Sequence, residues 1–86
     1  MSAAMSWYLY IAECGDRSLY TGIATDPQTR LQQHNAGRGS VYVRSKGAAT
    51  LVYVEAHRDR SAATRRELEI KSWRRRKKLA LIAHRS

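Results

Sequence analysis

The stretch LYTGIATDPQTRLQQH, residues 19–34, holds the step from a strand to a helix on which the expected fold depends. Residues 18–23 are a run of mostly β-favouring side chains, which predicts a strand. Thr25 or Asp26 is suited to cap a helix, and the proline that follows suits the first helical turn. We therefore expect a helix over residues 27–36.

Outside this stretch, the sequence predicts two further strands and two further helices. Residues 6–13 and 50–56 are rich in β-favouring side chains, and the apolar run in the second indicates a strand covered on both faces. Helices are expected over 61–72, with Ser61 as the N-cap, and over 74–83. The order ββαβαα predicts a small α+β domain, in which helices flank a three-stranded antiparallel sheet.

Length and composition indicate a single domain over residues 6–83, with flexible termini at 1–5 and 84–86. The chain has 86 residues, which suggests one domain, and 43% of them are hydrophobic, which favours a folded core. No apolar run approaches the roughly 18 residues that cross a bilayer, and the first residues lack the pattern of a signal peptide. We therefore expect a cytoplasmic protein without a membrane partner, with the nucleoid as an alternative location.

Positive charge gathers in the last third of the chain. Residues 58–86 hold eleven basic and three acidic residues, against five and four in residues 1–57. Twelve of the 16 basic residues are arginine, whose guanidinium is shaped for two-point contact with phosphate. The charge therefore predicts a nucleic-acid partner bound in a salt-dependent way, although a solvated helix face or docking to an acidic protein would fit the same composition.

Tyrosine, arginine and histidine side chains are spaced so that they can share one region of the fold. Arg30 and His34 are four residues apart, which puts them on one face of the expected helix. Tyr8 and Tyr10 share one face of the first strand, because side chains alternate along a strand. A hairpin with an odd number of loop residues puts Tyr20 on that face, whereas a four-residue loop puts it on the other. The sequence leaves both registers open.

The order of these motifs resembles that of the GIY-YIG nuclease domain, and most closely its short, stand-alone bacterial members. The matching features are WYLY, LYTGI, an arginine ten residues after Tyr20, HN before a glycine-rich loop, and RELEIK before a basic tail. SWY stands where the family has GIY, which matches Tyr8 to the first tyrosine of the family, and YTG stands for YIG. The resemblance covers residues 6–82.

The resemblance also implies a catalytic set and a metal ligand. The implied catalytic residues are Tyr8, Tyr20, Arg30, His34 and Glu67. Glu67 is implied to hold Mg²⁺ or Mn²⁺, because a single carboxylate with waters and phosphate oxygens suits such an ion, and Glu69 is the rival ligand. Arg30 is implied to bind the scissile phosphate. Either Tyr20 or His34 is implied to handle the proton of the attacking water.

The implied function is that of a metal-dependent endonuclease that hydrolyses DNA phosphodiester bonds, nicking at particular structures or strand ends, as in DNA repair. It includes no nucleotide cofactor and allows a protein partner for targeting. The alternative hypothesis is a module that binds DNA or RNA with little or no cleavage. Six basic residues are expected to contact nucleic acid: Arg38, Arg44, Lys46, Lys71, Arg74 and Arg75.

Overall fold

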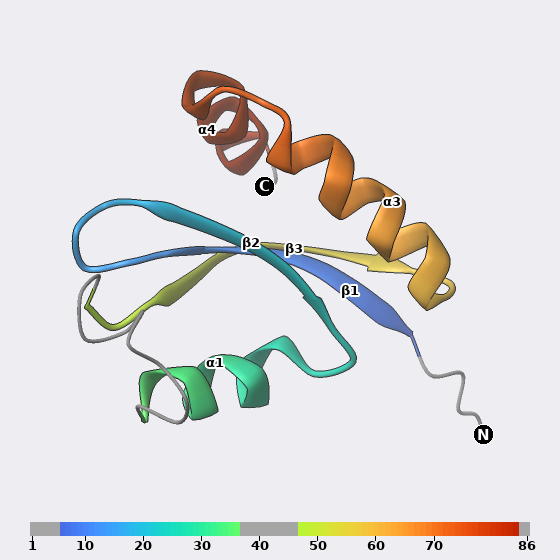
Figure 1. Ribbon diagram of the computed structural model, residues 1–86, viewed down its shortest axis with the longest axis horizontal. Coiled ribbons are helices and arrows are strands. Elements are labelled where there is room, and N and C mark those ends of the chain that lie inside the picture. Colours follow the sequence, from blue (N-terminus) through green and yellow to red (C-terminus); the bar gives the residue numbers. More distant parts are fainter. Residues whose placement is uncertain (1–5, 37–46, 85–86) are drawn as a thin grey trace.

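The computed structural model describes residues 6–36 and 47–84, and its described part has the expected order ββαβαα (Figure 1). The elements are β1 (Trp7–Glu13), β2 (Leu19–Ala24), α1 (Pro27–Asn35), β3 (Thr50–His57), α3 (Arg60–Lys71) and α4 (Arg75–Ala83). The predicted α+β class is therefore confirmed. Among the expected nucleic-acid contacts, Arg38, Arg44 and Lys46 lie outside the described residues.

The three strands form one antiparallel sheet in the order β2-β1-β3. The central strand, β1, is the one covered on both faces, since Leu9 and Ile11 are 0% exposed on one face and Tyr10 and Ala12 are buried on the other. The prediction that residues 50–56 are covered on both faces is wrong, because β3 is an edge strand and Val54 remains 41% exposed. An apolar run indicates a buried strand only where both neighbouring positions in the sheet are filled.

Helices cover the two faces of the sheet in separate layers, with α1 on one face and α3 and α4 on the other (Figure 1). The core on the α1 face consists of Tyr10, Ala12, Cys14, Ala24, Leu31 and Ala49. The core on the α3 face consists of Leu9, Ile11, Tyr53 and Ile70, with Trp73, Leu81 and Ile82 packed at its margin. Burial of each large aliphatic side chain contributes about 1.5–3 kcal/mol, so β1 anchors both layers.

The β1–β2 hairpin has the register that puts the three tyrosines on one face. Ala12 pairs with Tyr20 and Tyr10 pairs with Gly22, so Tyr20 shares its face with the even-numbered residues of β1. The turn contains Arg17 in the left-handed region, at φ 74°, and the Arg17 amide donates to the Cys14 carbonyl at 2.8 Å. This geometry belongs to hairpins whose loop has an odd number of residues.

Aspartate side chains cap the N-termini of α1 and α3. Asp26 accepts from the Thr29 amide at 3.2 Å at the start of α1, which decides between the two predicted caps. Asp59 accepts from the Ala62 amide at 2.8 Å and begins α3 at Arg60. The predicted cap at Ser61 is therefore wrong, because the carboxylate two residues earlier reaches the free amides of the first turn.

The end of α1 is tied to the start of β3 by one side chain. The amide group of Asn35 donates to the Ala49 carbonyl and accepts from the Ala49 amide, both at 2.8 Å. These two bonds fix where the segment after α1 returns to the sheet. None of the helices within the described residues has the length and apolar content that crossing a membrane requires.

Candidate active site

The strand β2 has a glycine where the ring of Tyr10 crosses it. Gly22 pairs with Tyr10, and a Cβ atom at Gly22 would lie 2.7 Å from the Tyr10 hydroxyl and 2.9 Å from its Cζ. Contacts this short do not occur between real side chains, so only glycine leaves room for this ring. The glycine of the YTG motif therefore places the Tyr10 hydroxyl above the outer strand of the sheet.

Tyr20 joins this tyrosine to the helix α1. The Tyr10 and Tyr20 rings have centroids 6.1 Å apart, with their planes tilted by 44°. The Tyr20 ring stacks on the imidazole of His34, with centroids 5.9 Å apart and planes at 25°. Tyr10, Tyr20 and His34 therefore form a continuous row of rings from β1 across β2 to α1.

The Tyr10 hydroxyl keeps its proton at neutral pH. Burial, together with the nearby Tyr20, raises the pKa of Tyr10 to about 12, while the positive charge of Arg30 opposes this shift and the negative charge of Glu67 adds to it. Interaction with the Tyr20 hydroxyl also raises this pKa, because it favours the protonated form of Tyr10. Tyr10 is therefore a neutral phenol beside Tyr20.

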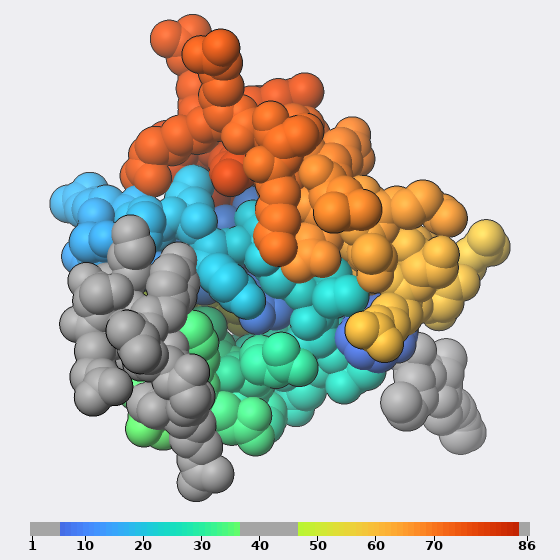
Figure 2. Space-filling view, in the orientation of Figure 1, coloured from blue at the N-terminus to red at the C-terminus, as the bar shows by residue number. Residues whose placement is uncertain are grey.

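Charges from both helical layers reach this tyrosine pair. Arg30 lies exposed on α1, one turn before His34. Glu67 lies on α3, on the opposite face of the sheet, and its side chain is 18% exposed. Both charges act on the Tyr10 hydroxyl, so α1 and α3 contribute to the same edge. We call the set Tyr10, Tyr20, Arg30, His34 and Glu67 the β2 site; Figure 2 shows β2, in turquoise, between α1, in green, and α3, in orange.

The rotation of α3 explains why Glu67 reaches the β2 edge. Ala63 and Ile70 are both 0% exposed and face the sheet. At about 100° per residue, Arg66 and Glu67 must then point to opposite flanks of the helix. Glu67 lies on the flank nearer β2, where its Oε2 is 3.2 Å from the Nζ of Lys71. Lys71, whose predicted contact with nucleic acid stays a prediction, pairs here with the implied metal ligand.

The donor set at Glu67 fits a hard divalent ion that takes its other ligands from water and substrate. Within residues 6–36 and 47–84, no group of three or more His, Cys, Asp or Glu side chains could hold a metal ion. A site of the zinc type is therefore not formed by these residues, whereas one carboxylate suits Mg²⁺ or Mn²⁺. The rival, Glu69, pairs with Nη1 of Arg66 at 3.1 Å on the other flank.

The tyrosine beside Tyr20 is Tyr10, and Tyr8 lies elsewhere on the same face. Tyr8 pairs with Ala24 and Ala56, two positions along the strand from Tyr10. Sequence reasoning matched Tyr8 to the first tyrosine of the family and placed Tyr10 in the core. Tyr10 is indeed 2% exposed, but its hydroxyl belongs to the site. The signal that would have found it is the glycine opposite it in the hairpin.

A second polar cluster lies at the other edge of the sheet and was missed from the sequence. Glu55 accepts hydrogen bonds from the Tyr53 hydroxyl at 2.5 Å and from Nε of Arg66 at 2.9 Å, and lies 2.7 Å from Nε2 of His57. The Arg66 guanidinium also lies 5.3 Å from the centroid of the Trp73 ring. We call Tyr53, Glu55, His57 and Arg66 the β3 cluster.

Mutual hydrogen bonding sets the charge states of the β3 cluster. Burial alone would raise the pKa of Glu55, but hydrogen bonds from Tyr53, Arg66 and His57 lower it. Burial would lower the pKa of Arg66, but its bonds to Glu55 and Glu69 raise it. Burial and the bond to Glu55 raise the pKa of Tyr53. The cluster is therefore an ionised pair held between β3 and α3.

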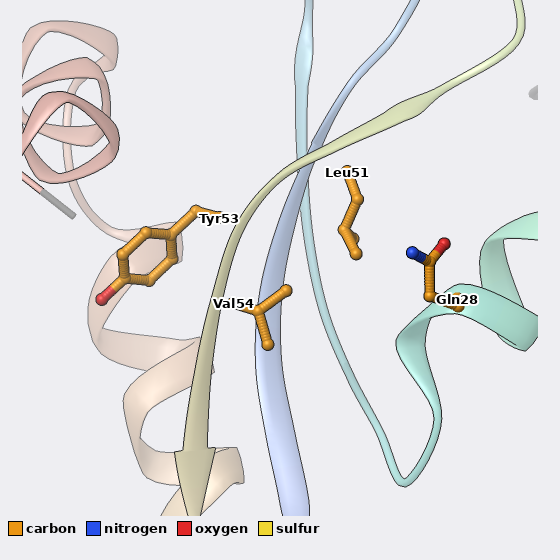
Figure 3. Close-up of a pocket in the computed structure, with 4 residues that line it drawn as sticks. All are labelled: Gln28, Leu51, Tyr53 and Val54. Atoms are coloured by element: carbon orange, nitrogen blue, oxygen red, sulfur yellow. The ribbon is translucent and has the colours of Figure 1, made fainter. Parts of the chain in front are cut away.

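A cavity of about 340 Å³ lies beside β3 and contains none of the residues of the β2 site. Gln28, Leu51, Tyr53 and Val54 line it. Leu51 and Val54 point toward the side of the sheet that carries Gln28, whereas Tyr53 points to the other side (Figure 3). The hydroxyl of Tyr53 is thus committed to the β3 cluster.

The family model of the GIY-YIG catalytic domain matches residues 6–80. The chain therefore belongs to the GIY-YIG family, whose catalytic domain is that of nucleases. It is similar to a UPF0213 protein of Haloquadratum walsbyi, with 51% identity over 86% of this chain and 83% of the relative. It is also similar to one of Staphylococcus haemolyticus, with 45% identity over 91% of this chain and 95% of the relative.

Two solved structures have the same fold. The solution NMR structure of a UPF0213 protein from Bacillus halodurans has a TM-score of 0.61 and 41% identity, and the match covers 94% of this chain and 86% of that one. The solution NMR structure of the protein EF2693 from E. faecalis has a TM-score of 0.64 and 33% identity, over 96% and 88%. The three-stranded antiparallel sheet with flanking helices is therefore a property of this group.

Proposed function

We propose that the protein is a divalent-metal-dependent endonuclease that nicks DNA by hydrolysing single phosphodiester bonds. The observation that carries the proposal is the pairing of the Tyr10 and Tyr20 rings at one sheet edge, within the electrostatic influence of Arg30 and Glu67; the four residues come from four separate elements of the chain. Phosphodiester cleavage needs an oriented water, a cation on the phosphate and help for the leaving oxygen. The β2 site offers a side chain for each of these needs.

Arg30 is the group that binds the scissile phosphate. Its side chain is exposed, and no carboxylate among the described residues forms an ion pair with it. A guanidinium without an acidic partner binds phosphate oxygens at two points and offsets the negative charge that grows on them during the reaction. The stacked Tyr20 and His34 lie on the same side of the sheet, where they face the phosphate bound by Arg30.

The tyrosine pair orients the attacking water. Tyr10 lies beside Tyr20 as a neutral phenol, and the Tyr20 hydroxyl is the one that holds the water. The water then gives its proton either directly to the imidazole of His34, or to the Tyr20 oxygen while the Tyr20 hydroxyl proton passes on to His34, whose ring stacks on Tyr20. Glu67 would hold the ion, and the chemistry that Mg²⁺ or Mn²⁺ supplies there when bound is Lewis-acid stabilisation of the leaving oxygen.

Basic side chains at the start of α4 extend the surface for nucleic acid. Arg74 and Arg75 are exposed, as are Arg76 and Lys77. Consecutive residues of a helix point in different directions, so these side chains suit a phosphate backbone better than base edges. A single β2 site makes one cut, so a monomer nicks rather than breaks both strands. Because contacts to the phosphate backbone do not read the base sequence, targeting would depend on strand structure, on strand ends or on a protein partner.

A second candidate function is binding of DNA or RNA with little or no cleavage. The observation that favours it is the contact of Glu67 with Lys71, which occupies the carboxylate that a metal ion would need. An ion pair at this spacing contributes only about 0.2–0.5 kcal/mol, so a divalent ion could displace it. The two candidates therefore differ in whether metal binding outcompetes this contact.

The test is cleavage of supercoiled plasmid and of branched and single-stranded oligonucleotides, in Mg²⁺, in Mn²⁺ and in EDTA. We expect nicking that requires the ion and that Tyr20→Phe, Arg30→Ala and Glu67→Ala each abolish. Arg58→Ala is the matched control, since Arg58 is an equally charged side chain that is 88% exposed and far in sequence from Tyr10 and Tyr20. Cleavage retained by all three variants would indicate a contaminating nuclease, and binding without cleavage would favour the second candidate.

A further inference from the structure

A hollow of about 170 Å³ lies next to Arg30, where the end of β2 meets the start of α1. Trp7 of β1 forms one wall, and Thr25, Asp26, Arg30 and Gln33 are among the other residues that line it. Arg30 thus belongs both to this hollow and to the β2 site. Whatever occupies the hollow therefore lies beside the phosphate that Arg30 is proposed to bind.

The size and walls of the hollow suit a flat ring. Pockets for drug-sized ligands measure about 300–1,000 Å³, so this one accommodates a single ring system. Trp7 is the aromatic residue among those that line the hollow, and the Arg60 guanidinium of α3 lies over its ring, 5.4 Å from the centroid. Stacking of a nucleobase on an aromatic side chain contributes about 1–3 kcal/mol, whichever base it is.

Apart from Arg30, the polar groups of the hollow favour a neutral ring over a phosphate. Thr25 has a hydroxyl and Gln33 an amide, and each can both donate and accept a hydrogen bond, as the edge of a base requires. Asp26 is ionised, because its bonds from the Thr29 hydroxyl and amide lower its pKa. A carboxylate in the wall repels a phosphate and leaves a neutral base unaffected.

We propose that this hollow receives one unpaired nucleobase, from the nucleotide next to the phosphate that Arg30 binds. The inference rests on the proposed endonuclease function and names its substrate class: a strand whose base at the cut is bulged, single-stranded or at an end. An intact duplex must first give up stacking and pairing, at a cost of a few kcal/mol, so it is a poorer ligand.

The test uses a fluorescent adenine analogue whose emission is quenched when it stacks. The analogue is placed as a single-nucleotide bulge in a duplex, and binding is measured in EDTA, so that cleavage plays no part in the readout. We expect the wild-type protein to quench the bulged analogue and to bind the bulged duplex more tightly than the paired one. Trp7→Leu is expected to lose the quenching and to weaken binding of the bulged duplex about 5- to 100-fold.

Two further variants distinguish loss of the base-binding hollow from loss of the fold. Trp7→Phe retains an aromatic ring and is expected to retain quenching, while Gln33→Ala removes an exposed side chain and is expected to weaken the preference for the bulge. Quenching that Trp7→Leu leaves unchanged, in a protein with wild-type circular dichroism, would overturn the proposal. Cleavage without quenching would refute this base site alone, whereas quenching without cleavage on any substrate would refute the endonuclease function alone.

Discussion

The two edges of the sheet carry the same four kinds of side chain in different states. Each edge has a tyrosine, an arginine, a histidine and a carboxylate: Tyr20, Arg30, His34 and Glu67 at β2, and Tyr53, Arg66, His57 and Glu55 at β3. At β3 the carboxylate contacts the other three side chains directly. At β2 the arginine is exposed and forms no ion pair with any described carboxylate.

This difference shows that the kinds of side chain present at an edge do not by themselves create a binding site. In the β3 cluster the ion pair is closed, so the charges hold α3 against β3 and have little capacity left for a ligand. In the β2 site the exposed Arg30 has no ion pair with a carboxylate of the described residues, so its charge is the one we propose for a phosphate. The four predictions below test this division of roles, beginning with the largest expected effect.

Replacement of the exposed arginine of the β2 site should impair cleavage and leave the stability of the fold nearly unchanged. Arg30→Ala is expected to lower the cleavage rate about 10²- to 10³-fold, because it removes the positive guanidinium that offsets the negative charge of the phosphate. It is expected to change the free energy of unfolding by less than about 0.5 kcal/mol. The measurements are single-turnover nicking and urea unfolding. Arg30→Lys should recover only part of the rate, since an ammonium makes a single-point contact. A stable Arg30→Ala variant with the wild-type rate would remove Arg30 from the site.

Substitution of the glycine beneath Tyr10 should disturb the β2 site through packing. Gly22→Ala places a Cβ atom 2.7 Å from the Tyr10 hydroxyl, so the buried ring must move. We expect a loss of about 1–3 kcal/mol in the free energy of unfolding and a loss of cleavage, because the Tyr10 ring is displaced from its contact with Tyr20. Tyr10→Phe is the comparison, since it removes the hydroxyl and keeps the ring. Wild-type stability and rate in Gly22→Ala would show that Tyr10 does not need this space.

Removal of the shared acceptor should destabilise the fold at β3. Glu55→Ala leaves Tyr53, His57 and Arg66 without their common partner, and we expect a loss of about 1–3 kcal/mol in the free energy of unfolding. Glu69→Ala is the matched control, because its carboxylate is 54% exposed and also pairs with Arg66, so its loss should be below about 1 kcal/mol. Equal effects of the two substitutions would mean that the β3 cluster is not a stabilising unit.

Alkaline pH should weaken the protein through Tyr10. Its pKa is about 12 in the folded state and 10.0 when unperturbed, so the unfolded chain releases this proton first. The contribution to stability is present below pH 10 and is lost as pH rises from 10 toward 12. We expect the melting temperature of Tyr10→Phe to fall less over this range than that of the wild type. Parallel curves for the two proteins would contradict a buried, protonated Tyr10.

Much of the fold could be predicted from local patterns. The strand at residues 18–23, the helix at 27–36 and the cap at Asp26 depend on neighbouring residues, and each lies within a residue or so of the observed bounds. The exposure of β3 could not be predicted, because an apolar run does not reveal which strand lies at the edge of a sheet. The cap of α3 was misplaced because two residues near its start can both cap a helix.

The candidate site was predictable where the spacing lies within one element. Arg30 and His34 share a helix face as expected, and Leu31 turns into the core. The choice between Tyr8 and Tyr10 lay beyond local pattern, since both share a strand face and only the pairing with Gly22 distinguishes them. The β3 cluster was likewise invisible, because Glu55 and Arg66 belong to different elements.

By itself, the sequence determined the order of strands and helices, the helix face that carries Arg30, and the excess of positive charge, because each follows from residues close together in the chain. Tertiary structure alone decided that Tyr10 meets Tyr20 and that Glu67, from the opposite layer, influences the same hydroxyl. The physical reason is that strand register and helix rotation are set by packing between distant segments, where a shift of one residue moves a side chain to the other face.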